Sequence, residues 1–448
     1  MDSRFSVRKR PEFSRQANDV MRKFIVLFML FGSGLWASPM HVDLRTVLRL
    51  AGERNEEVDA ARKRHAEALV ENRQAWQRYW PTLSVGGAYR GHEGRLQDIV
   101  GAVFDASKQQ YFSGAGAVID WTPGETHYAV LATKQRAVAA DKGVERARLD
   151  TVREAADRYY ELLGAEAGVS VVQDDVVVTE RYAGQLEAAV KVGTAFRADL
   201  LRVRTQLSRL RLQVRQLEEA VELSAARLAE TLRLPSDTAL RGAKADMVPV
   251  VVVREERLGA LISRARSERP EVASLAALTE AARTDEERAR RAPWVPSMQA
   301  GYSGGGFGGG MDGRLGRFGG QQDYFVGFSW KVGAGGLFDS VRKDGAAVRK
   351  ESLALSGKRL EAVIGREVVE AHARSRSARE QIRIAEESVV AAEEMTRLAG
   401  ERQASQVGVV LEYITAREEL TRARLAQVRA VMDHNRAQQA LRVAVGGR

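Results

Sequence analysis

Four segments of the chain alternate hydrophobic and polar residues with a period of two, in two pairs that lie far apart in the sequence. We expect strands at about residues 82–91 and 110–121, and again at about 297–303 and 323–333. Such alternation is typical of a strand with one apolar and one polar face. The apolar side of the pattern consists of Leu83, Val85, Tyr89, Tyr324, Val326, Phe328 and Trp330. The sequence therefore predicts two amphipathic strand pairs.

Helical patterns fill the rest of each half. Residues 43–78 are rich in Ala, Arg, Glu and Leu, and the helix should stop before Pro81, because proline disfavours helical geometry in the preceding residue. After the strand pairs, patterns without strong breakers cover 125–191 and 339–406. Each predicts one helix of roughly 100 Å at 1.5 Å per residue. Shorter helices follow at 198–232 and 411–445.

The second half of the chain repeats the first. Trp80-Pro81 corresponds to Val295-Pro296, 215 positions later, and Val192-Gly193 corresponds to Val407-Gly408 at the same offset. Such landmarks in one order and at one spacing indicate a structural repeat. The predicted units are a first repeat at 38–232, a linker at 233–255 and a second repeat at 256–448.

One returning helix carries a hydrophobic seam. Its residues Leu200, Val203, Leu207 and Leu210 are spaced alternately three and four. This heptad spacing predicts left-handed coiled-coil packing. The seam supports an architecture and does not by itself identify a function.

The N-terminus has the three parts of a secretory signal peptide. The basic residues Arg22 and Lys23 precede an apolar run at 24–31, and small residues lead to Ala37. We predict a signal peptide at 1–37, with Met21 as a second candidate start. A membrane anchor is the alternative, although the apolar run is shorter than the roughly 20 residues that a spanning helix needs.

Composition excludes several classes of protein. Of the 448 residues, 29% are charged, 9 are proline and none is cysteine, which favours long helices and excludes disulfides and thiolate metal sites. The net charge is +10. Arginine alternates with acidic residues along helical segments such as 146–153, without interleaved aromatic residues, so we expect solvated helix faces and no nucleic-acid partner.

Two glycine-rich motifs could suggest an enzyme. Residues 301–305 fit G-x-S-x-G, but a hydrolase needs a sharp strand-to-helix turn there, and further glycines follow. Residues 333–336 lack the Lys-Ser/Thr of a phosphate-binding loop. The six histidines show no ligand-spaced pair on a helix. We expect no catalytic residues, no metal and no cofactor.

The doubled order of helix, strand pair, long helix, Val-Gly turn and returning helix resembles the TolC family of outer-membrane channels, over about residues 41–446. The resemblance implies a homotrimer in the outer membrane of a Gram-negative bacterium. Four strands per protomer would join a shared twelve-stranded barrel in the lipid, and the helices would continue as a periplasmic tunnel. Substrates would arrive from an inner-membrane pump through a periplasmic adaptor. A periplasmic coiled-coil or adaptor protein without a pore is the alternative.

Barrel geometry independently favours three chains. Four strands leave two unpaired edges, which lipid does not tolerate. Eight strands from two chains give an interior filled by side chains, whereas twelve leave a conduit. A trimer is therefore the smallest plausible pore, and its apolar strand positions should face lipid.

The resemblance also implies two functional regions at the periplasmic tip. Adaptor contacts would fall on Val192, Gly193, Thr194, Val407, Gly408 and Val409. Pore constriction candidates are Asp199, Glu412 and Thr415. The alternatives are that the glycines only allow tight reversals and that the carboxylates only stabilise helix N-termini.

Overall fold

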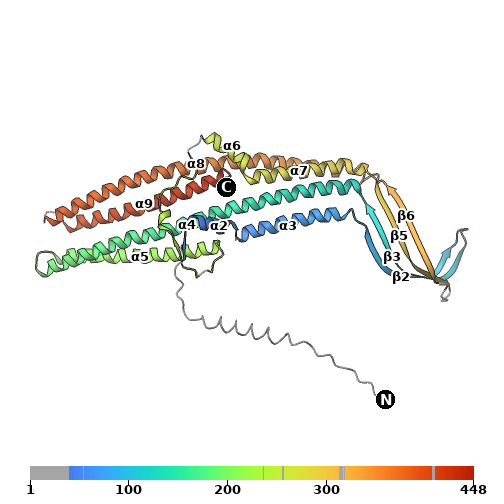
Figure 1. Ribbon diagram of the computed structural model, residues 1–448, viewed down its shortest axis with the longest axis horizontal. Helices are drawn as coiled ribbons and strands as arrows, with labels where there is room; N and C mark the ends of the chain where they lie inside the picture. Colours follow the sequence, from blue (N-terminus) through green and yellow to red (C-terminus); the bar gives the residue numbers. More distant parts are fainter. Residues whose placement is uncertain are drawn as a thin grey trace, which may run out of the picture.

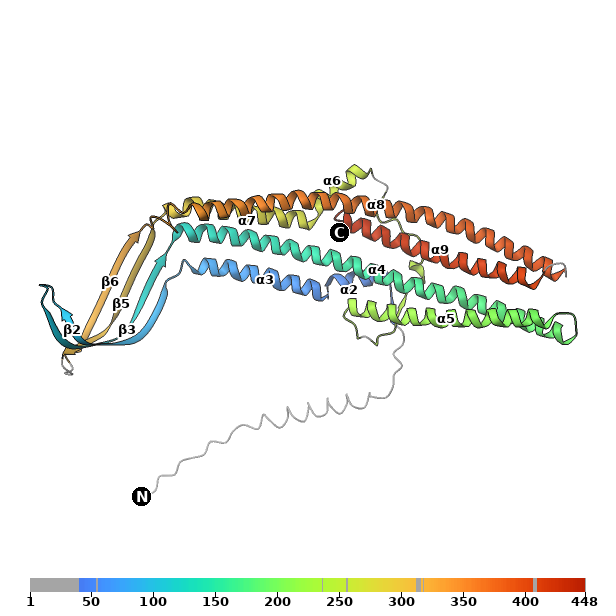
Figure 2. The ribbon, with the colours of Figure 1, turned by 180° about the vertical axis from the view of Figure 1, so that it is seen from behind.

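The protein is an elongated bundle of helices that continues at one end into a four-stranded sheet (Figures 1 and 2). The computed structural model describes residues 40–53, 55–235, 237–254, 257–311, 316, 318–405 and 409–447. The predicted signal peptide at 1–37, and Val407 and Gly408 of the second tip turn, lie outside these residues.

Two very long helices form the axis of the molecule. Helix α4 covers Pro123–Lys191, 69 residues, and α8 covers Ser340–Ala404, 65 residues. Proline begins α4, where the missing N–H costs nothing, and the side chain of Asp339 caps α8 by accepting a hydrogen bond from the Arg342 N–H. Each helix is roughly 100 Å long at 1.5 Å per residue.

Shorter helices run beside the long ones. Helices α5 (Arg197–Thr231) and α9 (Val410–Ala444) return from the tips of α4 and α8. Helices α3 (Glu56–Gln77) and α7 (Pro270–Arg291) line the sheet-proximal halves of the long helices (Figure 1). Leu200, Val203, Leu207 and Leu210 of the predicted seam are all buried.

The helix predicted at 43–78 is wrong as one element. It is divided into α2 (Leu44–Glu53) and α3. Asn55 causes the break: its backbone is extended, and its side-chain oxygen accepts a hydrogen bond of 2.8 Å from the Glu57 N–H, the geometry of a strong N-cap. The second repeat divides likewise into α6 (Leu258–Glu268) and α7, where Arg269 precedes Pro270.

The sheet is antiparallel, in the order β2-β3-β5-β6. Strands β2 (Thr82–Gln97), β3 (Val103–Trp121) and β5 (Ser297–Met311) extend further than predicted, and β6 (Gly319–Ser329) ends before the predicted residue 333. Glycines caused part of the error, because Gly304–Gly310 has the composition of a loop. A Cβ atom at Gly305 would lie 2.3 Å from the Ser113 carbonyl oxygen, so close strand approach requires glycine there.

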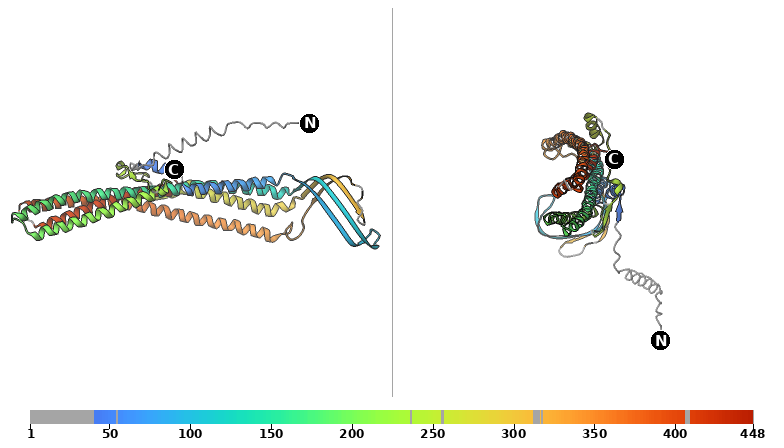
Figure 3. Two further views of the ribbon diagram at one scale, coloured as in Figure 1. Left: turned by 90° about the horizontal axis from the view of Figure 1, so that it is seen from below. Right: turned by 90° about the vertical axis from the view of Figure 1, so that its left-hand side faces the viewer.

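A small substructure lies at mid-length, on the convex side of the curved helix layer (Figure 3). Strands β1 (Met40–Val42) and β4 (Leu240–Gly242) pair in parallel, and the 3-10 helix η1 (Lys244–Asp246) follows. The linker beyond it is extended and bound to α9: the Asn435 side chain accepts from the Val250 N–H at 2.9 Å and donates to the Val248 carbonyl at 2.9 Å. The interval predicted as a linker thus includes ordered structure.

Candidate channel surfaces

The apolar positions of the first and last strands share one face of the sheet. Directly paired residues of neighbouring strands point to the same side, and the pairing connects Leu83 to Ala117, Ala117 to Tyr302, and Tyr302 to Tyr324. This face also carries Val85, Tyr89, Ile119, Met298, Ala300, Val326 and Phe328. Val85 and Tyr324 are 86% and 85% exposed, so the protomer leaves this apolar surface uncovered.

The opposite face consists mostly of polar residues and glycines. One row across it joins Ser84, Gly116, Ser303 and Asp323. Its large apolar side chains include Phe112 and Phe307, which pair directly, and Val118 and Phe325, which share a row with Gly301. The sheet therefore separates an apolar surface from a polar one, as a barrel wall between lipid and water does.

Aromatic residues bracket the apolar face. Trp121 ends β3, and ten positions earlier Tyr111 contacts Tyr89 with ring centroids 5.1 Å apart. Ten residues at about 3.3 Å with a tilt of about 45° give a height of roughly 23 Å, close to the apolar band of about 25 Å in outer-membrane barrels.

Trp330 was predicted within a strand but lies beyond the end of β6. Its indole N–H donates to the Trp294 carbonyl at 3.2 Å, and its ring contacts Phe328 edge-on at 5.9 Å. Trp294 belongs to the 3-10 helix η2 (Ala292–Trp294). Trp330 thus marks the junction between sheet and helices.

The first tip turn is tightly closed. Gly193 has φ +80°, a left-handed conformation that favours glycine, and the Thr194 N–H donates to the Ala189 carbonyl at 2.9 Å. Val192 and Phe196 are largely exposed, as is Val409 in the second turn. Phe196 was missed in the sequence, although an aromatic residue in a short turn between long helices was the available signal.

The three constriction candidates lie at the starts of α5 and α9. The N-cap residues are Phe196 and Val409, and neither has a side-chain cap hydrogen bond. Asp199 instead accepts from Arg202 at 2.9 Å, and Glu412 accepts from Arg402 across the hairpin at 2.9 Å. The Thr415 hydroxyl donates to the Leu411 carbonyl at 2.9 Å. Arg402 is a further charged residue that sequence reasoning missed.

A buried ion pair joins the two hairpins near the tip. Arg417 of α9 pairs with Asp175 of α4, and the Thr421 hydroxyl donates to the same carboxylate at 2.7 Å. The two charged side chains are only 17% and 4% exposed. Tyr182 and Tyr413 add an edge-on contact at 5.0 Å, and burial raises the pKa of Tyr182 to about 12.

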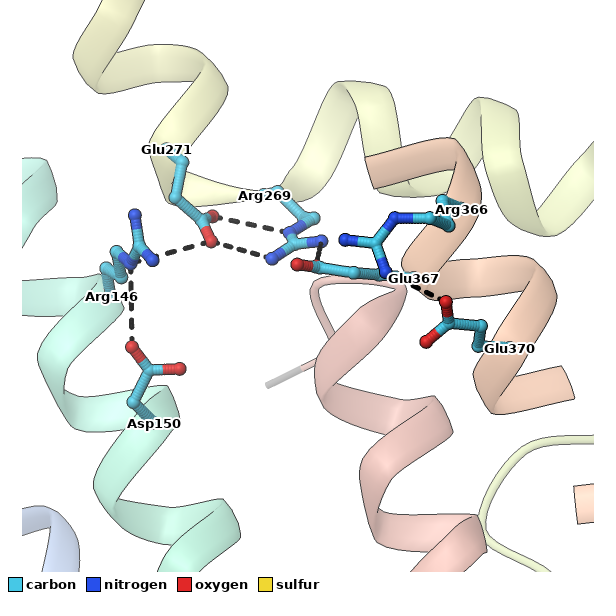
Figure 4. A network of polar contacts seen from close by, with 7 residues as sticks. All are labelled: Arg146, Asp150, Arg269, Glu271, Arg366, Glu367 and Glu370. Atoms are coloured by element: carbon cyan, nitrogen blue, oxygen red, sulfur yellow. Dashed lines mark hydrogen bonds and ion pairs between the residues drawn. The ribbon is translucent and has the colours of Figure 1, made fainter. Parts of the chain in front are cut away.

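A second polar network braces the mid-section (Figure 4). Arg269 lies between Glu271 at 2.8 Å and Glu367 of α8 at 2.5 Å, and Arg146 of α4 approaches Glu271 at 3.7 Å. Burial raises the pKa of Glu271, but the Arg269 guanidinium outweighs it and leaves that pKa below its ordinary value. The network connects α4, α7 and α8, which are also joined by ion pairs nearer the sheet, Arg136–Asp285 and Lys350–Glu286 among them.

The serine of the G-x-S-x-G motif lies within a strand. Ser303 lies in the middle of β5, paired with Gly116 and Asp323, and not at a strand-to-helix turn. Within the described residues, no three His, Cys, Asp or Glu side chains are grouped to hold a metal ion. None of the helices in that part of the chain combines the length and hydrophobicity needed to span a bilayer.

Solved structures with the same fold include membrane proteins, among them outer membrane channels. A membrane protein from Pseudomonas aeruginosa has a TM-score of 0.76 at 18% identity, over 90% of this chain and 93% of that one. The CmeC outer membrane channel of Campylobacter jejuni gives 0.74 at 16% identity, over 90% and 85%. The open state of the MtrE outer membrane channel of Neisseria gonorrhoeae gives 0.71 at 18%, over 90% and 89%.

Sequence comparison gives the family. The comparison with curated proteins finds no match. The sequence profile described as "Outer membrane efflux protein" matches residues 47–232 and 261–447, that is, both repeats and most of the chain. The resemblance inferred from the doubled landmarks is therefore confirmed, and the chain belongs to the outer membrane efflux protein family.

Proposed function

We propose that three copies of this chain form an outer-membrane channel through which substrates leave, delivered by an inner-membrane pump through a periplasmic adaptor. The observation that carries the proposal is the two-faced sheet joined directly to helices of roughly 100 Å. An apolar outer face and a polar inner face suit a lipid-embedded pore wall, and the helices have the reach of a periplasmic duct. No catalytic role is proposed for any residue.

Free edges in the protomer support assembly with further copies. Strands β2 and β6 are the outer strands of the sheet, and unpaired backbone groups are costly in lipid. Helix α8 carries Val341, Val348, Leu355 and Val369 at multiples of seven, and the described part of the protomer leaves this stripe exposed. A neighbouring copy that pairs the strand edges would also cover this stripe.

The alternative is a periplasmic coiled-coil or adaptor protein without a pore. A protein of that kind would not need an apolar sheet face on which residues such as Val85 and Tyr324 are highly exposed. Membrane fractionation separates the two functions. We expect the chain in the outer membrane and, after detergent extraction, in assemblies of three. A monomer in the soluble periplasmic fraction would support the alternative.

Adaptor docking is proposed at the tip turns. Val192 and Phe196 expose apolar side chains at the first turn, and Val409 does so at the second. A partner that covered these side chains would remove apolar surface from water. Photo-crosslinkers at Thr194 and Val409 should capture the adaptor, whereas one at exposed Arg215, midway along α5, should not. A working pump without tip crosslinks would contradict docking at these residues.

Glu412 is proposed to line the periplasmic aperture together with Asp199 and Thr415. Because Arg402 pairs with Glu412, Glu412→Gln removes a negative charge and also frees a positive one. We expect single-channel recordings to show reduced cation preference in Glu412→Gln and increased preference in Arg402→Gln. If both variants kept wild-type selectivity and lost only thermal stability, the carboxylate would serve the helix N-terminus alone.

A further inference from the structure

In the described strands, the outer rim of the sheet carries basic side chains on its polar face without an ion-pair partner. Arg90 pairs with Gln110, and His92 pairs with Lys108, in the register of β2 and β3. These positions alternate in phase with Ser84, so all belong to the polar face. Lys108 also pairs with Met311 in the last row that joins β3 to β5. Arg90, His92 and Lys108 are exposed, and we call them the basic rim.

The basic rim lies just beyond the aromatic boundary of the apolar band. Arg90 follows Tyr89 directly, and Tyr89 and Tyr111 form the boundary pair. The polar-face residues at this level therefore lie at the outer mouth of the proposed pore, and not within the membrane-embedded wall. Among the described residues, β2 and β3 continue beyond this level as a hairpin that ends at residues 98–102.

The carboxylates nearest to the rim, Glu93 and Asp105, point to the opposite face of the sheet. Within the part of the sheet that the structure describes, neither Arg90 nor Lys108 has an ion-pair partner. Asp105 pairs instead with Arg95 at 3.9 Å. Asp323 shares its row with Ser84, six residues from Arg90, which is about 20 Å along the strand at 3.3 Å per residue. Unpaired charges at diagonal strand positions repel each other, so folding alone does not explain them.

We propose that the basic rim is an anion-binding collar at the outer mouth, which favours the exit of substrates that carry several carboxylate or phosphate groups. The proposal rests on the channel function, since three protomers would bring three copies of Arg90 and Lys108 around one lumen. A ring of like charges facing a narrow aqueous space concentrates counter-ions. The effect is strong at low salt, because the Debye screening length exceeds about 10 Å when the ionic strength is below about 0.1 M.

Tripolyphosphate block of the purified protein in planar bilayers tests the collar. Added from the side of the β2–β3 hairpin, tripolyphosphate should reduce the wild-type conductance. In Arg90→Glu/Lys108→Glu the blocking concentration should rise by on the order of tenfold, and the reversal potential in a KCl gradient should move toward cation selectivity. Arg95→Glu, on the same strand but paired with Asp105, is the matched control and should behave as wild type.

Two outcomes overturn the collar in different ways. An open pore whose block and reversal potential are the same in the double variant and the wild type overturns the collar alone. Absence of any wild-type conductance contradicts the channel function and the collar with it. If the Arg90→Glu/Lys108→Glu protein fails to assemble, the same block and reversal potential are measured on Arg90→Gln and Lys108→Gln. These variants remove the charge and keep a polar side chain.

Discussion

Replacement of Arg417 by Met should destabilise the helical tip by about 3–5 kcal/mol per protomer, the usual cost of leaving one member of a buried ion pair without its partner. Asp175 is 4% exposed as a side chain, and Thr421 would remain its only hydrogen-bond donor. The largely buried carboxylate would then carry a charge that no cation compensates. Chemical denaturation followed by circular dichroism measures the loss.

Two further variants show whether burial is the cause. Arg424 lies on α9 like Arg417 and pairs with Glu393 of α8 at 2.8 Å, but its side chain is 39% exposed. Arg424→Met should therefore cost no more than about 1 kcal/mol. The double variant Asp175→Leu/Arg417→Met should recover much of the stability lost in Arg417→Met, since hydrophobic replacement of both partners is often neutral. Equal losses in Arg417→Met and Arg424→Met would contradict the argument.

Arginine at Val85 should destabilise the membrane-inserted sheet by about 2–4 kcal/mol, the cost of a charged side chain on the lipid face near the bilayer midplane. Val85 lies halfway between Trp80 and Tyr89, two exposed aromatic residues at the ends of the apolar band. Its side chain points to the apolar face and is not covered within the protomer. Unfolding from lipid vesicles by denaturant measures the difference from wild type.

The neighbouring residue provides the matched control. Ser84 points to the polar face, so Ser84→Arg should have a small effect although it lies at almost the same depth. Phe328→Arg should cost only about 0–1 kcal/mol, because Phe328 contacts Trp330 at the sheet–helix junction. Equal tolerance of arginine at positions 84 and 85 would show that the assigned facing is wrong.

The fold could be predicted largely because its strongest signals are local. Proline at positions 81 and 123, and period-two alternation between them, separate helix from strand without reference to the rest of the chain. Errors arose where tertiary contacts override composition. Gly304–Gly310 extends β5 because β3 lies against it, and Asn55 ends one helix and starts another while its amide donates to the Thr231 carbonyl.

The candidate surfaces were only partly predictable for the same reason. Strand alternation indicates that Leu83 and Tyr324 are apolar positions, but only the register of four strands shows that they share a face. Arg402 could not be assigned to Glu412 from spacing, because the turn between them sets the contact. The Asp175–Arg417 pair joins residues 242 positions apart, beyond any local pattern.

Single-channel recording on the purified wild-type protein tests the central claim most directly. If three copies form a continuous duct, reconstitution into planar bilayers should give discrete conductance steps of one uniform size, carried by assemblies whose mass corresponds to three chains. Protein that is extracted from the outer membrane as that assembly but never conducts, under voltage in either direction and with the adaptor present, would contradict the account.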